Sequence, residues 1–236
     1  MAGSPGTIYL VPTPIGNMSD ITARAIEVLG TVDLVACEDT RVSGNLLQKL
    51  GISKRLVSYH EFNERERATQ LVESVRQGQS VAVISDGGSP GISDPAYRIV
   101  RAAIENGLNL IALPGPCAII PALTASGLPT DRFFYEGFLS NKGAARRRRL
   151  EQLRDLPHTL VFYESPHRVV KTLIDMHEVL GDRQACLARE ISKKFEEFVR
   201  GKLSEISTRL EGRSIKGEIV LVVSGADRDR DDSSDD

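Results

Sequence analysis

The loop from Ser85 to Pro95 is the segment whose residue types most clearly predict ligand binding. It reads Ser-Asp-Gly-Gly-Ser-Pro-Gly-Ile-Ser-Asp-Pro and directly follows the apolar run Val81–Ile84. Its three glycines permit positive φ and close backbone approach, while Pro90 and Pro95 fix φ and remove N–H donors. Because ligands in open α/β sheets bind beyond the carboxyl ends of strands, we expect this loop to hold a small molecule. A structural turn is the alternative, but a turn usually needs only about two to five residues.

A second segment is strongly basic. Residues 142–149 read Lys-Gly-Ala-Ala-Arg-Arg-Arg-Arg. Four consecutive arginines place guanidinium groups around most of a helical turn, too many for one intramolecular ion-pair face. RNA phosphates are therefore the expected partners of the basic side chains here, Lys142, Arg146, Arg147, Arg148 and Arg149. The alternative is a solvated helix start paired with Glu151 and Asp155. Because aromatic residues make up only 5% and Trp is absent, we expect recognition through phosphate and RNA shape rather than extensive base stacking.

The composition is that of an ordinary globular protein. The chain has 236 residues, 41% of them hydrophobic, and a net charge of −2. No apolar run reaches the ~20 residues that span a bilayer, and no signal-peptide pattern is present, so we expect a cytoplasmic protein. Cys37, Cys117 and Cys186 lack metal-ligand or disulfide spacing, so no metal site is expected. Residues 227–236 hold six Asp and two Arg and are expected to be a disordered tail.

In the first half of the chain, short apolar runs alternate with amphipathic stretches, which predicts alternating strands and helices. The expected strands are Ile8–Val11, Leu34–Cys37, Arg55–Ser58, Val81–Ile84 and Asn109–Leu113. The expected helices are near Ile21–Leu29, Ser43–Leu50, Glu64–Gln77 and Ala96–Asn106. Asp20 and Ser43 are the expected N-caps. The expected C-terminal stops are Gly30, Gly51, Gly78 and Gly107.

After the proline-rich stretch 113–118 a second series begins. Its expected strands are Phe133–Glu136, Leu160–Tyr163, Gln184–Ala188, Glu197–Val199 and Ile219–Val223. Its expected helices lie near Ala145–Leu153, Pro166–Leu180 and Leu203–Leu210. We therefore predict an α/β protein of two lobes, residues 1–114 and 115–226, with a cofactor cleft between them and the tail 227–236 outside. The pattern leaves the strand order open.

Five motifs, taken in order, resemble those of the tetrapyrrole methylase superfamily. They are Val11–Asn17, Cys37–Arg41, Ser85–Pro95, Ser126–Asp131 and Phe162–Arg168. The resemblance runs from Thr7 to Ser224 and implies a class III methyltransferase fold, in which two α/β lobes bind S-adenosyl-L-methionine. Within the superfamily, the motifs are similar to those of bacterial enzymes that methylate the ribose 2′-hydroxyl of a decoding-centre cytidine in 16S rRNA. The resemblance thus implies a homodimeric enzyme whose partner is 16S rRNA in the small ribosomal subunit.

The resemblance also implies which residues bind the cofactor. They are Gly87, Gly88, Ser89, Pro90, Ile92, Cys117, Ala118, Tyr163, Glu164 and Gly217. The chain departs from the superfamily pattern at two places. Ser89 stands where relatives have an acidic residue, which implies that a charged contact to the cofactor ribose is missing. Pro12 and Pro14 stand where tetrapyrrole enzymes have glycine, which fits a different methyl acceptor.

Methyl transfer to a ribose hydroxyl requires in-line alignment of the reactants, which can supply ~7–11 kcal/mol of the barrier. A positioned base increases the rate by roughly 10²–10⁴-fold. Glu38, at the end of the second strand, matches an acidic residue implicated as base in relatives, and Asp39 is the second candidate. Alternatively, both carboxylates cap the helix near Ser43 or pair with Arg41. His60 follows the third strand, where it could accept a proton or orient RNA. Alternatively, it has only a solvated or capping role. Arg41 is expected to contact RNA.

Three functions follow from these observations. The leading one is an S-adenosylmethionine-dependent rRNA (cytidine-2′-O-)-methyltransferase. A precorrin-type methylase with a small tetrapyrrole acceptor is the nearest alternative, and it predicts an acidic residue at the position of Ser89. The third is a non-catalytic assembly factor that binds rRNA with the same fold.

Overall fold

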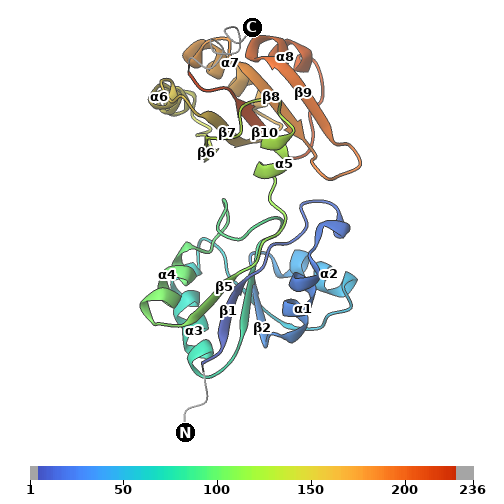
Figure 1. The fold of residues 1–236 in the computed structure, drawn as a ribbon, viewed down its shortest axis with the longest axis vertical. Coiled ribbons are helices and arrows are strands. Elements are labelled where there is room, and N and C mark those ends of the chain that lie inside the picture. Colours follow the sequence, from blue (N-terminus) through green and yellow to red (C-terminus); the bar gives the residue numbers. More distant parts are fainter. Residues whose placement is uncertain (1–4, 227–236) are drawn as a thin grey trace. The chain divides into compact units, whose positions relative to one another are not determined.

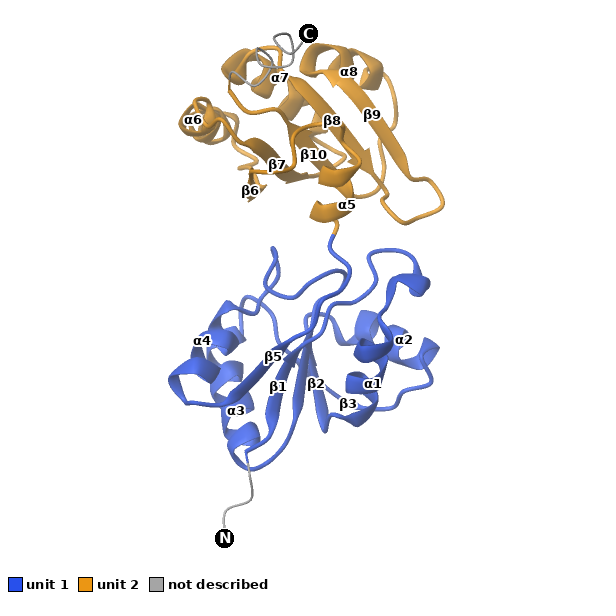
Figure 2. Cartoon of the chain, in the orientation of Figure 1, with its two compact units in different colours: residues 1–117 blue, residues 118–236 orange. Residues whose placement is uncertain are grey.

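The protein is an α/β chain with two separate five-stranded sheets. A computed structural model describes residues 5–226 (Figure 1). The chain divides into two compact units, residues 1–117 and 118–236 (Figure 2), and the boundary falls slightly later than the expected one after residue 114. The α/β class is confirmed, whereas the acidic tail expected at 227–236 lies outside the described residues.

The first unit is built on a parallel sheet with the strand order β3-β2-β4-β1-β5. Its strands are β1 (Thr7–Leu10), β2 (Leu34–Cys37), β3 (Arg55–Ser58), β4 (Val81–Ile84) and β5 (Asn109–Ala112). Its helices are α1 (Ala23–Thr31), α2 (Thr40–Lys49), α3 (Glu64–Arg76) and α4 (Tyr97–Glu105), with a short 3₁₀ turn, η1, at Met18–Asp20. Because every neighbouring pair is parallel, all five strands end at the same edge of the sheet.

Both faces of this sheet are covered, as a parallel sheet requires. One core packs alternate strand residues against α3 and α4, through Leu71 and Ile99 among others. The other core packs the intervening strand residues against α1 and α2, through Leu29 and Leu47. Figure 1 shows α1 and α2 on the opposite side of the sheet from α3 and α4. The continuous apolar runs of β2 and β4 follow from this double coverage, since all eight of their residues are buried.

The second unit has a mixed sheet with the strand order β6-β7-β10-β8-β9, in which only β6 and β7 are parallel. Its strands are β6 (Phe133–Phe138), β7 (Thr159–Glu164), β8 (Gln184–Arg189), β9 (Glu197–Lys202) and β10 (Ile219–Val223). Its helices are α5 (Ile119–Thr124), α6 (Gly143–Leu153), α7 (Val169–Leu180) and α8 (Leu203–Leu210). One hydrophobic core joins α6, α7 and α8 to the sheet.

Helix starts differ from the expected ones because other side chains cap them. Thr22 caps α1, where its Oγ1 accepts a hydrogen bond from the Ala25 N–H at 3.0 Å, so the expected cap at Asp20 is wrong. Asp39 caps α2, and the expected cap Ser43 is instead a buried residue within that helix. A cap at Asp39 starts the helix at Thr40, several residues earlier than the sequence pattern indicated.

Helix ends follow the glycine pattern with one exception. Gly51, Gly78 and Gly107 have φ of 70°, 94° and 62° just after α2, α3 and α4, which confirms them as C-terminal stops. Gly30 is wrong as a stop, because α1 continues through it to Thr31.

Candidate active site

Three loops meet at the carboxyl edge of the first unit's sheet. They follow β1 (residues 11–17), β4 (residues 85–95) and β5 (residues 113–117). The strand order β4-β1-β5 makes these strands immediate neighbours, although β1 and β5 lie about a hundred residues apart in sequence. The loops therefore emerge side by side at the place where open parallel sheets bind ligands.

Hydrogen bonds fuse the first two of these loops. The Thr13 N–H donates to the Gly88 carbonyl and the Gly88 N–H donates to the Thr13 carbonyl, both at 2.9 Å. The buried Thr13 hydroxyl also donates to the Ser85 carbonyl at 3.1 Å. The Ser85 hydroxyl in turn donates to the Gly88 carbonyl at 3.0 Å. These four bonds fix the start of the 85–95 loop against the loop after β1.

The third loop is tied to the other two by a hydroxyl and by a close backbone approach. The Ser89 hydroxyl donates to the Pro116 carbonyl at 2.9 Å. A Cβ atom on Gly115 would stand 2.7 Å from Cβ of Pro12, so no larger residue fits there without a shift. The serine that replaces the superfamily's acidic residue is thus used to hold the loops together.

The 85–95 loop contains backbone conformations that hold it in one shape. Gly88 and Gly91 have φ of 93° and 87°, which glycine adopts freely. Ser93 has φ of 64°, a conformation that costs a non-glycine residue about 1–2 kcal/mol. The Ile92 N–H donates to the Ser89 carbonyl at 3.2 Å and closes a tight turn around the half-buried Pro90. Gly87 is exposed at the tip of the same loop.

Asp39 is held by the start of α2. Its carboxylate accepts a hydrogen bond from the Arg41 N–H at 2.8 Å and forms an ion pair with the Arg41 guanidinium at 2.6 Å. The hydrogen bond from the Arg41 side chain lowers the pKa of Asp39 to about 2. A carboxylate of that pKa is a weak base, so these contacts give Asp39 a capping role, one of the alternatives open from the sequence. They also occupy part of the exposed Arg41 guanidinium.

Glu38 lies beside two other carboxylates that end or follow strands. Burial raises the pKa of Glu38, the charge of Asp86 raises it further, and His60 opposes the shift. Burial together with the charges of Glu38 and Asp86 raises the pKa of Asp94 to about 7. The Asp86 carboxylate also accepts a hydrogen bond from the Asp39 N–H at 3.1 Å. These groups repel one another, so the cluster retains a proton, or attracts a cation, near neutral pH.

His60 is oriented by Asn63. The Asn63 Oδ1 accepts the His60 N–H at 2.9 Å, and Nδ2 donates to the Ser58 carbonyl at 3.2 Å, which fixes the orientation of the amide. The same Nδ2 lies 3.2 Å from His60 Nε2 and can only donate, so Nε2 accepts and the neutral ring carries its proton on Nδ1. Within residues 5–226 the buried Nδ1 has no hydrogen-bond partner.

A pocket of about 490 Å³ opens where β2, β3 and β4 end. It contains both the candidate base Glu38 and the candidate RNA contacts Arg41 and His60. Its lining residues are Glu38, Asp39, Thr40, Arg41, Ser58, His60, Glu61, Phe62 and Asp86. Sequence reasoning missed Asn63, Phe62 and Asp86 as site residues. An available signal was an aromatic residue standing alone within the polar run His60–Glu64.

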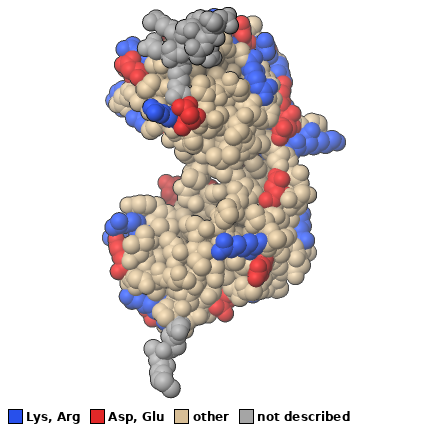
Figure 3. Space-filling view, in the orientation of Figure 1, with Lys and Arg blue, Asp and Glu red and all other residues tan. Residues whose placement is uncertain are grey.

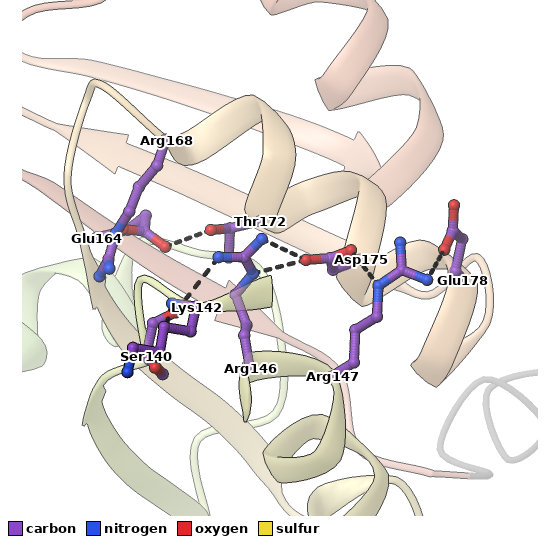
Figure 4. Close-up of polar contacts among 9 residues, drawn as sticks. All are labelled: Ser140, Lys142, Arg146, Arg147, Glu164, Arg168, Thr172, Asp175 and Glu178. Carbon is purple, nitrogen blue, oxygen red and sulfur yellow. Dashed lines mark hydrogen bonds and ion pairs between the residues drawn. The ribbon is translucent and has the colours of Figure 1, made fainter. Parts of the chain in front are cut away.

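The cofactor residues expected in the second unit are held by intramolecular contacts. The buried Glu164 carboxylate accepts hydrogen bonds from the Ser165 N–H and the Thr172 hydroxyl, both at 2.6 Å, and from the Arg168 guanidinium. Figure 4 shows Glu164 with Thr172 and Arg168. Tyr163 packs edge-on against Tyr135, with ring centroids 5.3 Å apart. The Glu164 carboxylate is therefore used for hydrogen bonds at the start of α7. A contact between this segment and a cofactor would have to come from the backbone or from Tyr163.

The remaining expected cofactor residues lie outside these clusters. Cys117 ends the first unit as a half-buried free thiol, and Ala118 begins the second unit just before α5. Gly217 has φ of 89°, and a Cβ on it would collide with the Glu190 side chain, so glycine is required there. Their contacts with a cofactor stay predictions.

Arginines of the basic run at 146–149 on α6 form ion pairs within the second unit, and Figure 4 shows those of Arg146 and Arg147 with α7. Arg146 and Asp175 are 7% and 6% exposed and pair with each other, with Arg146 Nε donating to the carboxylate at 2.6 Å. Arg147 pairs with the same Asp175 at 2.6 Å and with Glu178 at 2.7 Å. Asp175 and Glu178 lie one helical turn apart on α7, so Arg147 can reach both carboxylates. The Asp175 carboxylate is shared by Arg146 and Arg147. Arg146 is therefore buried and unable to contact RNA, which corrects the expectation for this residue.

Arg149 is paired as well, with Glu136 of β6 at 2.6 Å. The four arginines do not share one ion-pair face: Arg146 and Arg147 pair with α7 and Arg149 pairs with β6. Glu151 and Asp155, the partners expected in the alternative interpretation, form no ion pair with them in the described residues. Within residues 5–226 the exposed side chains of Lys142 and Arg148 form no ion pair, so they stay predicted RNA contacts. Figure 3 shows basic and acidic side chains interspersed over the face that it draws.

Between residues 5 and 226, no group of three or more His, Cys, Asp or Glu side chains could hold a metal ion. None of the described helices has the length and apolar character needed to cross a membrane.

Comparisons with known proteins agree with the five motifs. The family model of tetrapyrrole (corrin/porphyrin) methylases matches residues 7–207. Ribosomal RNA small subunit methyltransferase I of Micromonospora olivasterospora is 52% identical over 235 residues, which cover 97% of this chain and 75% of that protein. The protein of the same name from Escherichia coli O157:H7 is 48% identical over 225 residues, covering 94% of this chain and 79% of its own.

Solved structures of the same fold are more distant in sequence. Uroporphyrin-III-C-methyltransferase from Thermus thermophilus has a TM-score of 0.63 at 23% identity, covering 93% of this chain and 94% of that one. Cobalt precorrin-4 methyltransferase has a TM-score of 0.68 at 15% identity, covering 92% and 94%. Identities this low support the fold and nothing narrower.

The Arg146–Asp175 pair predicts a large effect on stability. The substitution Asp175→Asn leaves the buried Arg146 charge without its anion, so we expect the free energy of unfolding to fall by about 3–5 kcal/mol. The matched control, Arg148→Gln, removes an exposed charge and should change it by less than about 0.5 kcal/mol. Urea unfolding of both variants measures the difference. Similar stabilities for the two variants would show that the pair contributes little.

The raised pKa of Asp94 predicts a pH-dependent stability. In the folded chain this pKa is raised to about 7 from the ordinary value of 3.8. As pH rises between these values the unfolded chain releases the proton and the folded chain retains it, so the contribution to stability is full below about pH 4 and is lost towards pH 7.

The substitution Asp94→Asn should abolish this loss, so the variant should gain stability over the native protein as pH increases. Urea unfolding at about pH 5 and about pH 8 tests it, with the exposed Asp155→Asn as control. Equal pH dependence in the native protein and the Asp94→Asn variant would contradict the assignment.

Proposed function

The chain belongs to the tetrapyrrole (corrin/porphyrin) methylase family, and from that membership we propose that it transfers a methyl group from S-adenosyl-L-methionine to the ribose 2′-hydroxyl of a decoding-centre cytidine in 16S rRNA. The observation that carries the proposal is the similarity, over nearly the whole chain, to proteins named ribosomal RNA small subunit methyltransferase I. The acceptor would be 16S rRNA within the small ribosomal subunit, which implies a cytoplasmic protein.

The fused loops fit S-adenosyl-L-methionine better than a nucleoside triphosphate. The segments 11–17, 85–95 and 113–117 contain no Lys or Arg, which a triphosphate would need. They instead offer glycine backbone and small side chains, with Gly87 exposed and Gly115 packed against Pro12. The carboxylates of Asp86 and Asp94 within the 85–95 loop, and that of Glu38 beside it, complement the positive charge of a sulfonium. We propose that the loops hold the cofactor through their backbone and that these carboxylates attract its sulfonium charge.

When bound, S-adenosyl-L-methionine supplies an electrophilic methyl group that needs no metal. The protein must align the ribose hydroxyl with that group and remove the hydroxyl proton. Glu38 is suited to take this proton, because its raised pKa makes it a stronger base than an ordinary glutamate. In such a transfer the Glu38 carboxylate would take the proton that the ribose hydroxyl loses as its oxygen receives the methyl group. His60 lines the same pocket with a ring orientation fixed by Asn63.

Two alternative functions remain, a methylase with a tetrapyrrole acceptor and a factor without catalysis. A tetrapyrrole acceptor fits the fold, but the loop after β1 carries prolines where tetrapyrrole enzymes have glycine. A non-catalytic rRNA-binding factor would not need a carboxylate of raised pKa at the sheet edge. We further propose that the chain acts as a homodimer. Sedimentation at micromolar concentration tests this, and the mass of a monomer would contradict it.

The acceptor is identified by the position of a labelled methyl group. Small ribosomal subunits from a strain that lacks the modification are incubated with the protein and methyl-labelled S-adenosyl-L-methionine. We expect the label on the ribose of a single cytidine. Because a 2′-O-methyl group blocks alkaline cleavage of the adjacent phosphodiester, that bond should resist alkali. Label on a base, or labelling of a precorrin-type tetrapyrrole but not of the subunits, would contradict the proposed function.

Loss of the Glu38 carboxylate should impair the chemical step alone. For Glu38→Gln we expect single-turnover methyl transfer to slow by about 100-fold, since a positioned base contributes roughly 10²–10⁴-fold. The affinity for S-adenosylhomocysteine, measured by calorimetry, should be nearly unchanged. Glu27→Gln, an exposed change on α1, is the control. If the Glu38→Gln variant turns over at the native rate, Glu38 is not the base.

A further inference from the structure

The pocket beside Glu38 has an aromatic ring at its mouth that nothing within residues 5–226 covers. Phe62 lines the pocket and is 91% exposed, more than any other large hydrophobic residue described. Its ring and the His60 ring form an edge-type contact, with centroids 6.0 Å apart and planes inclined by 62°. Because Phe62 is almost fully exposed, its ring still has free surface on which a ligand can stack.

The turn that carries Phe62 is rigid on both sides. Asn63 accepts the His60 N–H and donates to the Ser58 carbonyl, as described above. Tyr59 is buried, and its hydroxyl accepts the Ile99 N–H of α4 at 3.3 Å. The phenyl ring is therefore presented by a fixed backbone, and little ordering of the turn is needed when a ligand binds.

The charges around the ring select the chemistry of the ligand. Glu61 is exposed beside Phe62, and Asp86 lies across the same pocket, so a phosphate inside it would meet like charges. Carboxylates do accept hydrogen bonds from amino groups, including the exocyclic amino group of cytosine. The guanidinium of Arg41, 87% exposed in its side chain, is a cation on the same lining and suits a phosphate that stays outside.

We propose that this pocket binds one unstacked, amino-bearing base of single-stranded RNA, with the base stacked on Phe62 and its amino group donating to Glu61. Cytosine and adenine fit this description and uracil does not, because uracil lacks an exocyclic amino group. The inference deepens the proposed function and rests on it for the identity of the RNA. It differs from the expectation drawn from the composition, since one exposed phenyl ring supplies the stacking that the few aromatic residues were not expected to provide.

The first test measures binding without catalysis. Short oligoribonucleotides of cytidine, of adenosine and of uridine, labelled with a fluorophore, are titrated with the native protein and with Phe62→Ala, Phe62→Trp and Glu61→Gln. We expect the cytidine and adenosine oligomers to bind more tightly than the uridine oligomer. Phe62→Ala should weaken their binding by about 10-fold, since a stacked base is worth ~1–3 kcal/mol. Phe62→Trp should preserve it, and Glu61→Gln should reduce the preference over uridine.

The control is Ile104→Ala, which removes an exposed apolar side chain from α4 and should leave all affinities unchanged. The second test measures methyl transfer to small subunits, where Phe62→Ala should raise KM by a similar factor while leaving calorimetric binding of S-adenosylhomocysteine unchanged. Unaltered oligomer binding and KM in Phe62→Ala, or equal affinity for cytidine and uridine oligomers, would overturn the base pocket. Failure of the native protein to methylate RNA, with these oligomer preferences intact, would instead overturn the proposed function.

Discussion

The backbone pairing between Thr13 and Gly88 is the contact on which the candidate site depends. These two residues exchange hydrogen bonds at 2.9 Å and lie in loops that follow adjacent strands of a parallel sheet. The buried Thr13 hydroxyl, the Ser85 hydroxyl and the Ser89 hydroxyl extend the same network to the loop after β5. A loop of eleven residues rich in glycine would otherwise sample many conformations, so the network removes conformational entropy before any ligand arrives.

Electrostatics divide the sheet edge into two functional parts. The loops after β1, β4 and β5 carry no basic residue and suit a cofactor recognised through backbone groups. Within the 85–95 loop, Asp86 and Asp94 lie near Glu38. Burial and the neighbouring carboxylate charges raise the pKa values of Glu38 and Asp94, so a nearby cation or a bound proton relieves the repulsion. Three arginines of the basic run on α6, in contrast, form ion pairs within the second unit, with Asp175, Glu178 and Glu136. Charge density in the sequence was thus a poor guide to charge available at the surface.

Local sequence predicted the strands well and the polar partners poorly. The bounds of β2, β4 and β10 follow directly from buried apolar runs, and the resemblance of five motifs predicted the family. The strand order and the partners of Arg146 depend on contacts between residues far apart in sequence, which no local pattern encodes. The Asp39 cap was open as an alternative because Asp is a favoured N-cap residue and a helix was expected just after it. Phe62 was missed because a single aromatic residue acquires meaning only from the pocket around it.

The central claim, that the three fused loops hold the cofactor, is tested most directly by hydrogen exchange. Amide exchange is followed by mass spectrometry with and without saturating S-adenosylhomocysteine, the demethylated product. We predict added protection in the peptides covering residues 12–16, 85–95 and 114–117, with the strands β2 and β3 unchanged. Binding seen by calorimetry without protection of these three loops would contradict the account.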